Sequence, residues 1–232
     1  EAGSVCGTTL YVGGIVGYNN TNALDNATNT GEVKVLGTSG SRTIVGGIVG
    51  TPNRCITNCT NLAPITVNGT MAGAGVGGCI GYVQANGNGA NKNLVNEAPI
   101  SVSGTTTATN HIGGIMGNNN LSNTQSNFEN KAKGVITVNF SEGSTGDAYV
   151  GGVAGLLQDA SAQLYNRATI NITGHIGGTL HVGGVVASGT GSVSVPTDLG
   201  TAVSLALVVN VVVAKSRDLN LGTGNLSLTN LT

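Results

Sequence analysis

The sequence predicts an all-β fold: a single right-handed parallel β-solenoid of about six repeats of roughly 34 residues, closed by a C-terminal β cap. Three observations predict it. A glycine-rich phrase, first seen as 12-VGGIVG-17, occurs six times. A second phrase separates successive copies and ends in alternating β-branched residues. No period of 3.6 residues persists through a whole repeat, which argues against helices.

The glycine-rich phrase marks the same bend in every repeat. Its spacings are 33, 31, 36, 38 and 32 residues, close to one turn of a solenoid. A glycine lacks a Cβ, so it permits close backbone approach and unusual dihedral angles. We therefore expect a structural corner at the first glycine of each pair. These glycines are Gly13, Gly46, Gly77, Gly113, Gly151 and Gly183.

The second phrase reads N-x-x-N, a small residue, and then two β-branched residues separated by one position. Alternation with period two is typical of a half-buried strand. Residues at one aligned position of successive repeats form a column. Three further columns are expected to face inward. They are Val12, Val45, Val76, Ile112, Val150 and Val182; Ile15, Ile48, Cys79, Ile115, Val153 and Val185; and Ala27, Cys59, Leu94, Phe128 and Leu164.

Asparagine occupies two further columns of the second phrase. Stacked amides can hydrogen-bond from one repeat to the next, and asparagine also tolerates left-handed turns. We expect the first column to form a structural ladder. It contains Asn29, Asn61, Asn96, Asn130 and Asn166, and the column beside it contains Asn26, Asn58, Asn93, Asn127 and Gln163.

Composition excludes several classes of partner. Only 8% of residues are charged and the net charge is −1, so the chain lacks the basic face that nucleic acids or anionic membranes require. The longest apolar run, residues 202–214, is shorter than the about 20 residues of a spanning helix. No signal peptide is recognisable. We expect no nucleic-acid partner and no direct membrane insertion by this segment.

The copy at residues 45–69, VGGIVGTPNRCITNCTNLAPITVNG, resembles the GLUG-type repeat of bacterial surface proteins. The resemblance covers residues 3–195. It implies a parallel β-solenoid on a secreted or cell-surface protein with adhesin-like roles, as in gut Bacteroidetes, and it implies no catalytic residues. The right-handed coil follows from the resemblance and from the usual hand of parallel crossovers.

Two regions are expected along the chain. Residues 1–195 hold the repeats and begin mid-repeat, because 4–7 aligns with 34–37, so an upstream segment is expected. Residues 196–232 contain neither phrase but include strand-like runs at 203–213 and 226–231. A solenoid end exposes apolar core and strand edges, so this tail is interpreted as a cap, or as the junction to a neighbouring domain.

Cysteines and acids give little sign of catalysis. The cysteines lack C-x-x-C spacing and histidine occurs only at three positions, so buried free thiols are expected, with one disulfide as the alternative and no metal or cofactor. The main acids fall in different columns, and the closest pair, Glu142 and Asp147, lies in a loop. The four cysteines are Cys6, Cys55, Cys59 and Cys79, and the acids that fall in different columns are Asp25, Glu32, Glu97, Glu129, Asp147 and Asp159.

One outer column suggests recognition. The residue before the inward Val or Ile is, in order, Tyr11, Ile44, Gly75, His111, Tyr149 and His181. Aromatic and polar rings on an uncharged face can contact sugars, so Tyr11, His111, Tyr149 and His181 are candidate carbohydrate-binding residues. The alternative is plain strand surface, because tyrosine also suits strands.

These observations favour a non-enzymatic, extracellular or cell-surface adhesin-like module. It would attach to an outer membrane through the upstream segment and bind a surface glycan or protein of host or bacterial origin. A structural spacer that presents another domain is the first alternative. A polysaccharide-acting β-helix enzyme is the second, and it would require acids and bases grouped in one groove.

Overall fold

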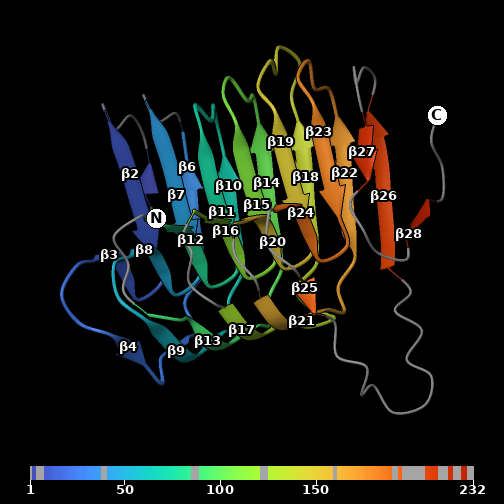
Figure 1. Ribbon diagram of the computed structural model, residues 1–232. Helices are drawn as coiled ribbons and strands as arrows, with labels where there is room; N and C mark the ends of the chain where they lie inside the picture. Colours follow the sequence, from blue (N-terminus) through green and yellow to red (C-terminus); the bar gives the residue numbers. More distant parts are fainter. Residues whose placement is uncertain are drawn as a thin grey trace.

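The computed structural model describes residues 2–3, 8–37, 41–84, 89–120, 125–158, 161–189, 193–194, 207–213, 219–221 and 226–228. The regular elements in these ranges are all strands, and every pairing between them is parallel. They stack along one axis as a solenoid (Figure 1). The six glycine-rich phrases therefore mark five full turns, and the predicted all-β parallel solenoid is confirmed.

Each complete repeat contributes one strand to each of four sheets. Sheet 1 contains β1 (Ala2–Gly3), β6 (Val33–Leu36), β10 (Ile65–Asn68), β14 (Ile100–Gly104), β18 (Ile136–Phe140), β22 (Ile170–Gly174), β26 (Leu207–Val213) and β28 (Leu226–Leu228). Sheet 2 contains β2 (Thr9–Gly13), β7 (Arg42–Gly46), β11 (Ala74–Gly77), β15 (Asn110–Gly113), β19 (Ala148–Gly151), β23 (Leu180–Gly183) and β27 (Leu219–Leu221).

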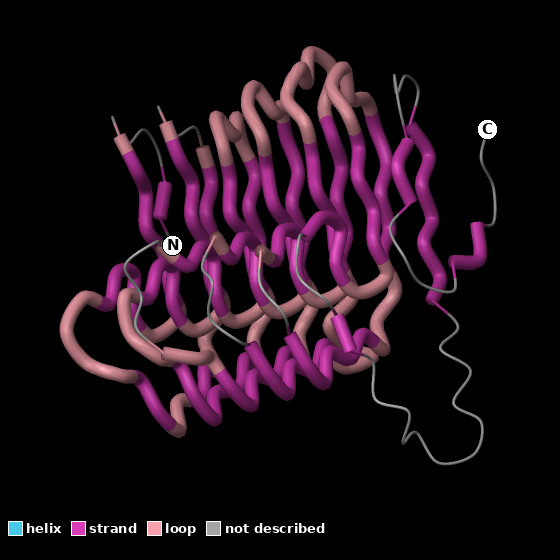
Figure 2. Tube along the Cα trace, in the orientation of Figure 1, coloured by secondary structure: helices cyan, strands magenta, loops and turns pink. Residues whose placement is uncertain are grey.

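The other two sheets complete each turn. Sheet 3 contains β3 (Val16–Asn19), β8 (Val49–Pro52), β12 (Ile80–Val83), β16 (Met116–Asn119), β20 (Ala154–Leu157) and β24 (Val186–Gly189). Sheet 4 contains β4 (Leu24–Asp25), β9 (Ile56–Asn61), β13 (Lys92–Asn96), β17 (Gln125–Asn130), β21 (Ser161–Asn166) and β25 (Val193–Ser194), and the short β5 (Thr28–Asn29) pairs with β9. Figure 2 shows the same succession of strands and loops along the Cα trace.

The solenoid encloses two separate apolar cores. One core lies between sheets 1 and 2 and includes Val67, Val76 and Ile112. The other lies between sheets 3 and 4 and includes Ile48 and Phe128. Burying each such side chain contributes about 1.5–3 kcal/mol, so the stacked columns dominate stability.

The three predicted inward columns divide between these cores. The Val12 column packs in the first core, whereas the Ile48 and Cys59 columns pack in the second. One member differs from expectation: Ile15 is 44% exposed. Ile15 belongs to the first repeat, and among the described residues only the second repeat packs against it.

A narrow waist separates the two cores, and the predicted asparagine column lies there. Each amide donates to the next across the repeats, from Asn29 to Asn61 (2.9 Å), to Asn96 (2.9 Å), to Asn130 (3.0 Å) and to Asn166 (3.0 Å). Asn61 also donates to the carbonyl of Ala63 at 2.9 Å, which turns the chain from sheet 4 into sheet 1. Both hydrogens of the amide are thereby used in a buried place, as buried polar groups require.

The glycine pair forms the other side of the waist. A Cβ on Gly46 would lie 2.0 Å from the carbonyl oxygen of Val49, so the corner closes only without a side chain. A Cβ on Gly47 would lie 2.5 Å from Cγ of Asn61. The repeated Gly-Gly pair and the repeated asparagine are thus two halves of one contact.

The second asparagine column lies on the outside of the fourth sheet in left-handed turns. Asn26, Asn58, Asn93, Asn127 and Gln163 have φ between 53° and 61°. Asn127 donates to Asn93, and Asn93 to Asn58, each at 2.7 Å. A second, exposed amide ladder therefore runs parallel to the buried one.

Short strands near both ends of the chain pair with strands of the solenoid sheets. In the tail, β26 and β28 extend sheet 1 and β27 extends sheet 2. Whether the tail is a cap or a junction stays a prediction, because most of 196–232 lies outside the described residues. At the start, Ala2 pairs with Val35. Residues 4–7, which the prediction aligned with 34–37, lie outside the described residues.

Candidate functional site

The outer faces of sheets 2 and 3 meet at a concave angle that runs along the solenoid beside the waist. We call this concave angle the inside corner. The third glycine of the first five phrases makes this corner tight: a Cβ on Gly117 would lie 2.5 Å from the backbone nitrogen of Val76, and one on Gly155 would lie 2.7 Å from that of Ile112. Side chains on the two outer faces consequently reach one another across the corner. One example is Tyr11 of β2 with Tyr18 of β3, whose ring centroids lie 5.1 Å apart.

The predicted recognition column lies on the sheet 2 side of this corner. Its six residues pair in consecutive register along the sheet, from Tyr11 through Ile44, Gly75, His111 and Tyr149 to His181. The last three carry rings that stack. The centroids of His111 and Tyr149 lie 5.0 Å apart at 15°, and those of Tyr149 and His181 lie 4.3 Å apart at 3°. We call these three residues the ring stack.

Tyr11 lies apart from the ring stack. Ile44 and Gly75 separate it from His111, and its ring is tilted by 58° against Tyr18. Its hydroxyl accepts a hydrogen bond from Nε2 of Gln84 at 3.4 Å. The structure therefore brings together three of the four candidate carbohydrate-binding residues and places the fourth three repeats away from His111.

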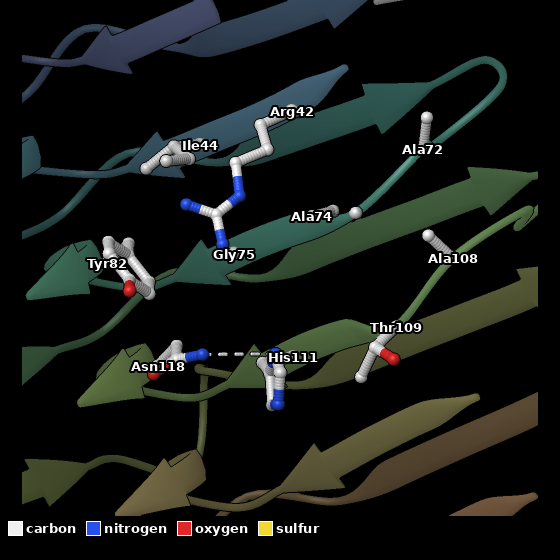
Figure 3. Close-up of a pocket in the computed structure, with 11 residues that line it drawn as sticks. Arg42, Ile44, Ala72, Ala74, Gly75, Tyr82, Ala108, Thr109, His111 and Asn118 are labelled. Carbon is white, nitrogen blue, oxygen red and sulfur yellow. Dashed lines mark hydrogen bonds between the residues drawn. The ribbon is translucent and has the colours of Figure 1, made fainter. Parts of the chain in front are cut away.

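A hollow of about 260 Å³ opens where Gly75 interrupts the column. Figure 3 shows Arg42 and Ile44 on one side of Gly75 and His111 on the other, with Tyr82 and Asn118 across the corner. Arg42 is exposed and extends over Tyr82, with Cζ 5.2 Å from the ring centroid, a cation–π contact. We call this feature the Gly75 hollow.

His111 forms one wall of the Gly75 hollow as a neutral imidazole. Burial, together with the nearby charge of Arg42, lowers its pKa from 6.5 to about 4. Nδ2 of Asn118 lies 3.2 Å from its Nδ1 (Figure 3). Because the amide NH₂ is the donor, Nδ1 accepts and Nε2 carries the ring hydrogen. One face of the ring contacts Tyr149 and the other faces the hollow.

Asn118 brings a free acceptor to the same place. Its side chain is only 8% exposed, and its Oδ1 has no hydrogen-bond partner. Leaving a buried acceptor without a partner costs about 1–3 kcal/mol. A hydroxyl or amide of a ligand in the hollow would satisfy it.

Sequence reasoning missed the sheet 3 side of the corner and Arg42. The signal was present: the residue after the third glycine forms a column of its own, which comprises Tyr18, Thr51, Tyr82, Asn118, Leu156 and Ser188. Arg42 lies two residues before Ile44, and alternation places both on the outer face. That its side chain extends toward the next repeat could be seen only in the structure.

Glu97, Glu129 and Asp147 have structural partners, and Asp147 also lies near the ring stack, where burial and then the charge of Asp147 raise the pKa of Tyr149. Glu97 pairs with Lys131, and Glu129 pairs with Arg167 at 2.7 Å. Asp147 accepts from the backbone of Thr179 at 2.7 Å. No residue that lines the Gly75 hollow is acidic, and Asp159 lies outside the described residues.

The cysteines fill core positions. Cys59 and Cys79 are fully buried free thiols in the second core, and burial raises the pKa of both. Cys55 is partly exposed, and Cys6 lies outside the described residues. In the part of the chain that the structure describes, no three His, Cys, Asp or Glu side chains are grouped to hold a metal ion. No helix there is long and apolar enough to cross a membrane.

The fold and the corner define the class of this chain, a parallel β-solenoid repeat protein with a ring stack on its surface. No protein-family model, no curated protein and no solved structure matches it.

Proposed function

We propose that the chain is a non-enzymatic, saccharide-binding module of the cell surface, with its site at the inside corner. The observation that carries this proposal is the ring stack. Three partly exposed rings lie one above another at 4.3–5.0 Å on a face with little charge. The extracellular position and the adhesin-like role rest on the resemblance of the repeat phrases.

The geometry indicates how a sugar would contact the site. Both faces of the Tyr149 ring are covered, by His111 on one side and His181 on the other. A sugar therefore meets the ring edges along the stack, where the Tyr149 hydroxyl and the imidazole nitrogens can hydrogen-bond to its hydroxyls. The face of the His111 ring that Tyr149 does not cover faces the Gly75 hollow, which His111 lines.

A binding screen tests the proposal. The purified chain is titrated with a panel of host and bacterial oligosaccharides, beside the variants Tyr149→Ala and Tyr11→Ala. We expect Tyr149→Ala to weaken binding about tenfold or more, the range of one lost aromatic contact at a recognition site. Tyr11→Ala is the matched control, because the same residue type lies in the same column but outside the ring stack, and it should bind normally. A blank across the panel, or equal losses in both variants, would contradict the proposal.

A spacer is the second candidate function, and the continuous ladders favour it. Parallel pairing runs without a break from β2 to β23, and the buried asparagine ladder runs alongside it. Such a stack resists bending because each repeat is bonded to both neighbours. A protein that binds no saccharide yet keeps an attached domain at a fixed distance, measured by small-angle scattering, would favour this function.

A further inference from the structure

We propose that the Gly75 hollow selects an acidic saccharide, with the carboxylate of a hexuronate on Arg42 and its ring against the open face of His111. This inference rests on the proposed function and names the ligand class of that site. It depends on three properties of the hollow: its width, its single charge and its unpartnered acceptor.

The width of the hollow suits one ring. Neighbouring repeats lie about 4.8 Å apart, so Ile44 and His111, which are two repeats apart, are separated by about twice that spacing. The ring stack fills each repeat position with one ring at 4.3–5.0 Å. At Gly75 the position carries no side chain, and a Cβ there would lie 2.8 Å from the carbonyl oxygen of Gly81. The chain thus keeps open one ring-sized position at the end of the stack.

The charge of the hollow is one unpaired cation. Arg42 contacts the Tyr82 ring, and no described carboxylate forms an ion pair with it. Among the residues that line the hollow, His111 is neutral and none is acidic. A guanidinium binds a carboxylate through two parallel hydrogen bonds, which gives geometric selectivity as well as attraction. An anionic group is therefore the natural partner of this side chain.

The polar groups of the hollow indicate a ligand that also carries hydroxyls. Oδ1 of Asn118 is a buried acceptor without a partner, so it requires a donor from the ligand. Nε2 of His111 carries a hydrogen and can donate. A sugar hydroxyl both donates and accepts, so a hydroxylated ring with one carboxylate satisfies all of these groups.

The test compares matched saccharides. Short oligosaccharides of galacturonate, mannuronate and glucuronate are titrated calorimetrically, each beside its carboxyl-reduced form, in which a neutral CH₂OH replaces the carboxylate on the same ring. We expect at least one acidic form to bind about tenfold or more tighter than its reduced form, since hydrogen bonds between charged groups are about twice as strong as neutral ones. Arg42→Gln should remove that difference between the acidic and the reduced form, and Arg42→Lys should retain part of it. Arg42 is exposed, so these variants should fold normally, which circular dichroism checks.

The outcomes separate this inference from the proposed function. Equal binding of the acidic and reduced forms, or a preference that survives Arg42→Gln, would overturn the acidic-saccharide inference and leave saccharide binding in place. The same holds if neutral glycans of the wider panel bind and none of the three uronates does. If no saccharide binds at all, both the inference and the proposed function fall.

Discussion

The side chain of Asn96 lies directly against Gly78 at the waist of the solenoid. A Cβ on Gly78 would lie 2.5 Å from Cγ of Asn96 and 2.0 Å from the carbonyl oxygen of Gly114. The asparagine is fully buried and belongs to the ladder that joins the repeats. This contact repeats along the chain, and it explains why a glycine pair and an asparagine recur together.

Replacing Asn96 by alanine should destabilise the protein strongly. The change removes the acceptor of Asn61 and the donor to Asn130, so two buried polar groups lose a partner. At about 1–3 kcal/mol for each such group, we expect the free energy of unfolding to fall by about 2–6 kcal/mol, measured by urea denaturation. Asn68→Ala, at an exposed position of β10, is the control and should change stability by less than about 0.5 kcal/mol. Similar losses in the two variants would show that the ladder is not what stabilises the waist.

Gly78→Ala should be at least as damaging, for a steric reason. The new Cβ would meet backbone and a buried amide, neither of which can rotate away. Overpacking of this kind costs about 1–3 kcal/mol, and more when backbone must shift. Gly31→Ala is the matched control, because a Cβ there meets only Oδ1 of Asn29 at 3.7 Å. Thermal unfolding compares the two, and a tolerated Gly78→Ala would refute the close contact at the waist.

The imidazole of His111 should titrate well below the ordinary pKa of a histidine side chain. Its pKa is lowered to about 4, first by burial and then by Arg42. Between pH 6.5 and 4 the unfolded chain binds a proton there that the folded chain does not. The free energy of unfolding therefore falls as the pH is lowered through this window, by at most about 1.4 kcal/mol per pH unit, and this contribution is constant below pH 4.

The chemical shifts of the histidine ring resonances, followed by NMR against pH, measure this titration. The variant His111→Gln assigns the resonance of His111. The same variant provides the stability control, because its unfolding free energy should depend less on pH between 6.5 and 4 than that of the native chain. A midpoint near 6.5 for His111 would contradict its burial beside Arg42.

Much of the fold could be predicted from the sequence because the same pattern of apolar residues, glycines and asparagines recurs in each repeat. Period-two alternation identified the inward columns, and the recurring asparagines identified the amide ladder. The division into two cores could not be predicted, because alternation shows which residues face inward but not which sheet they face. That division depends on the contact between the glycine pair and the ladder, such as Gly47 with Asn61.

The site was predictable in part. His111, Tyr149 and His181 share a column that the sequence places on one face, and their rings do stack. Gly75 interrupts the run of side chains in that column, and the hollow lies at this position. Asn118 and Tyr82 come from the neighbouring sheet, and only the angle of the inside corner brings them to His111.

Binding of saccharides at the inside corner can be observed directly by NMR of the protein with isotope-labelled histidine. The oligosaccharides of the screen are added one at a time while the three histidine resonances are followed. At least one saccharide should shift the resonances of His111 and His181 saturably and leave the resonance of His175, which lies outside the corner, unchanged. No shift with any saccharide, or a shift of His175 alone, would contradict it.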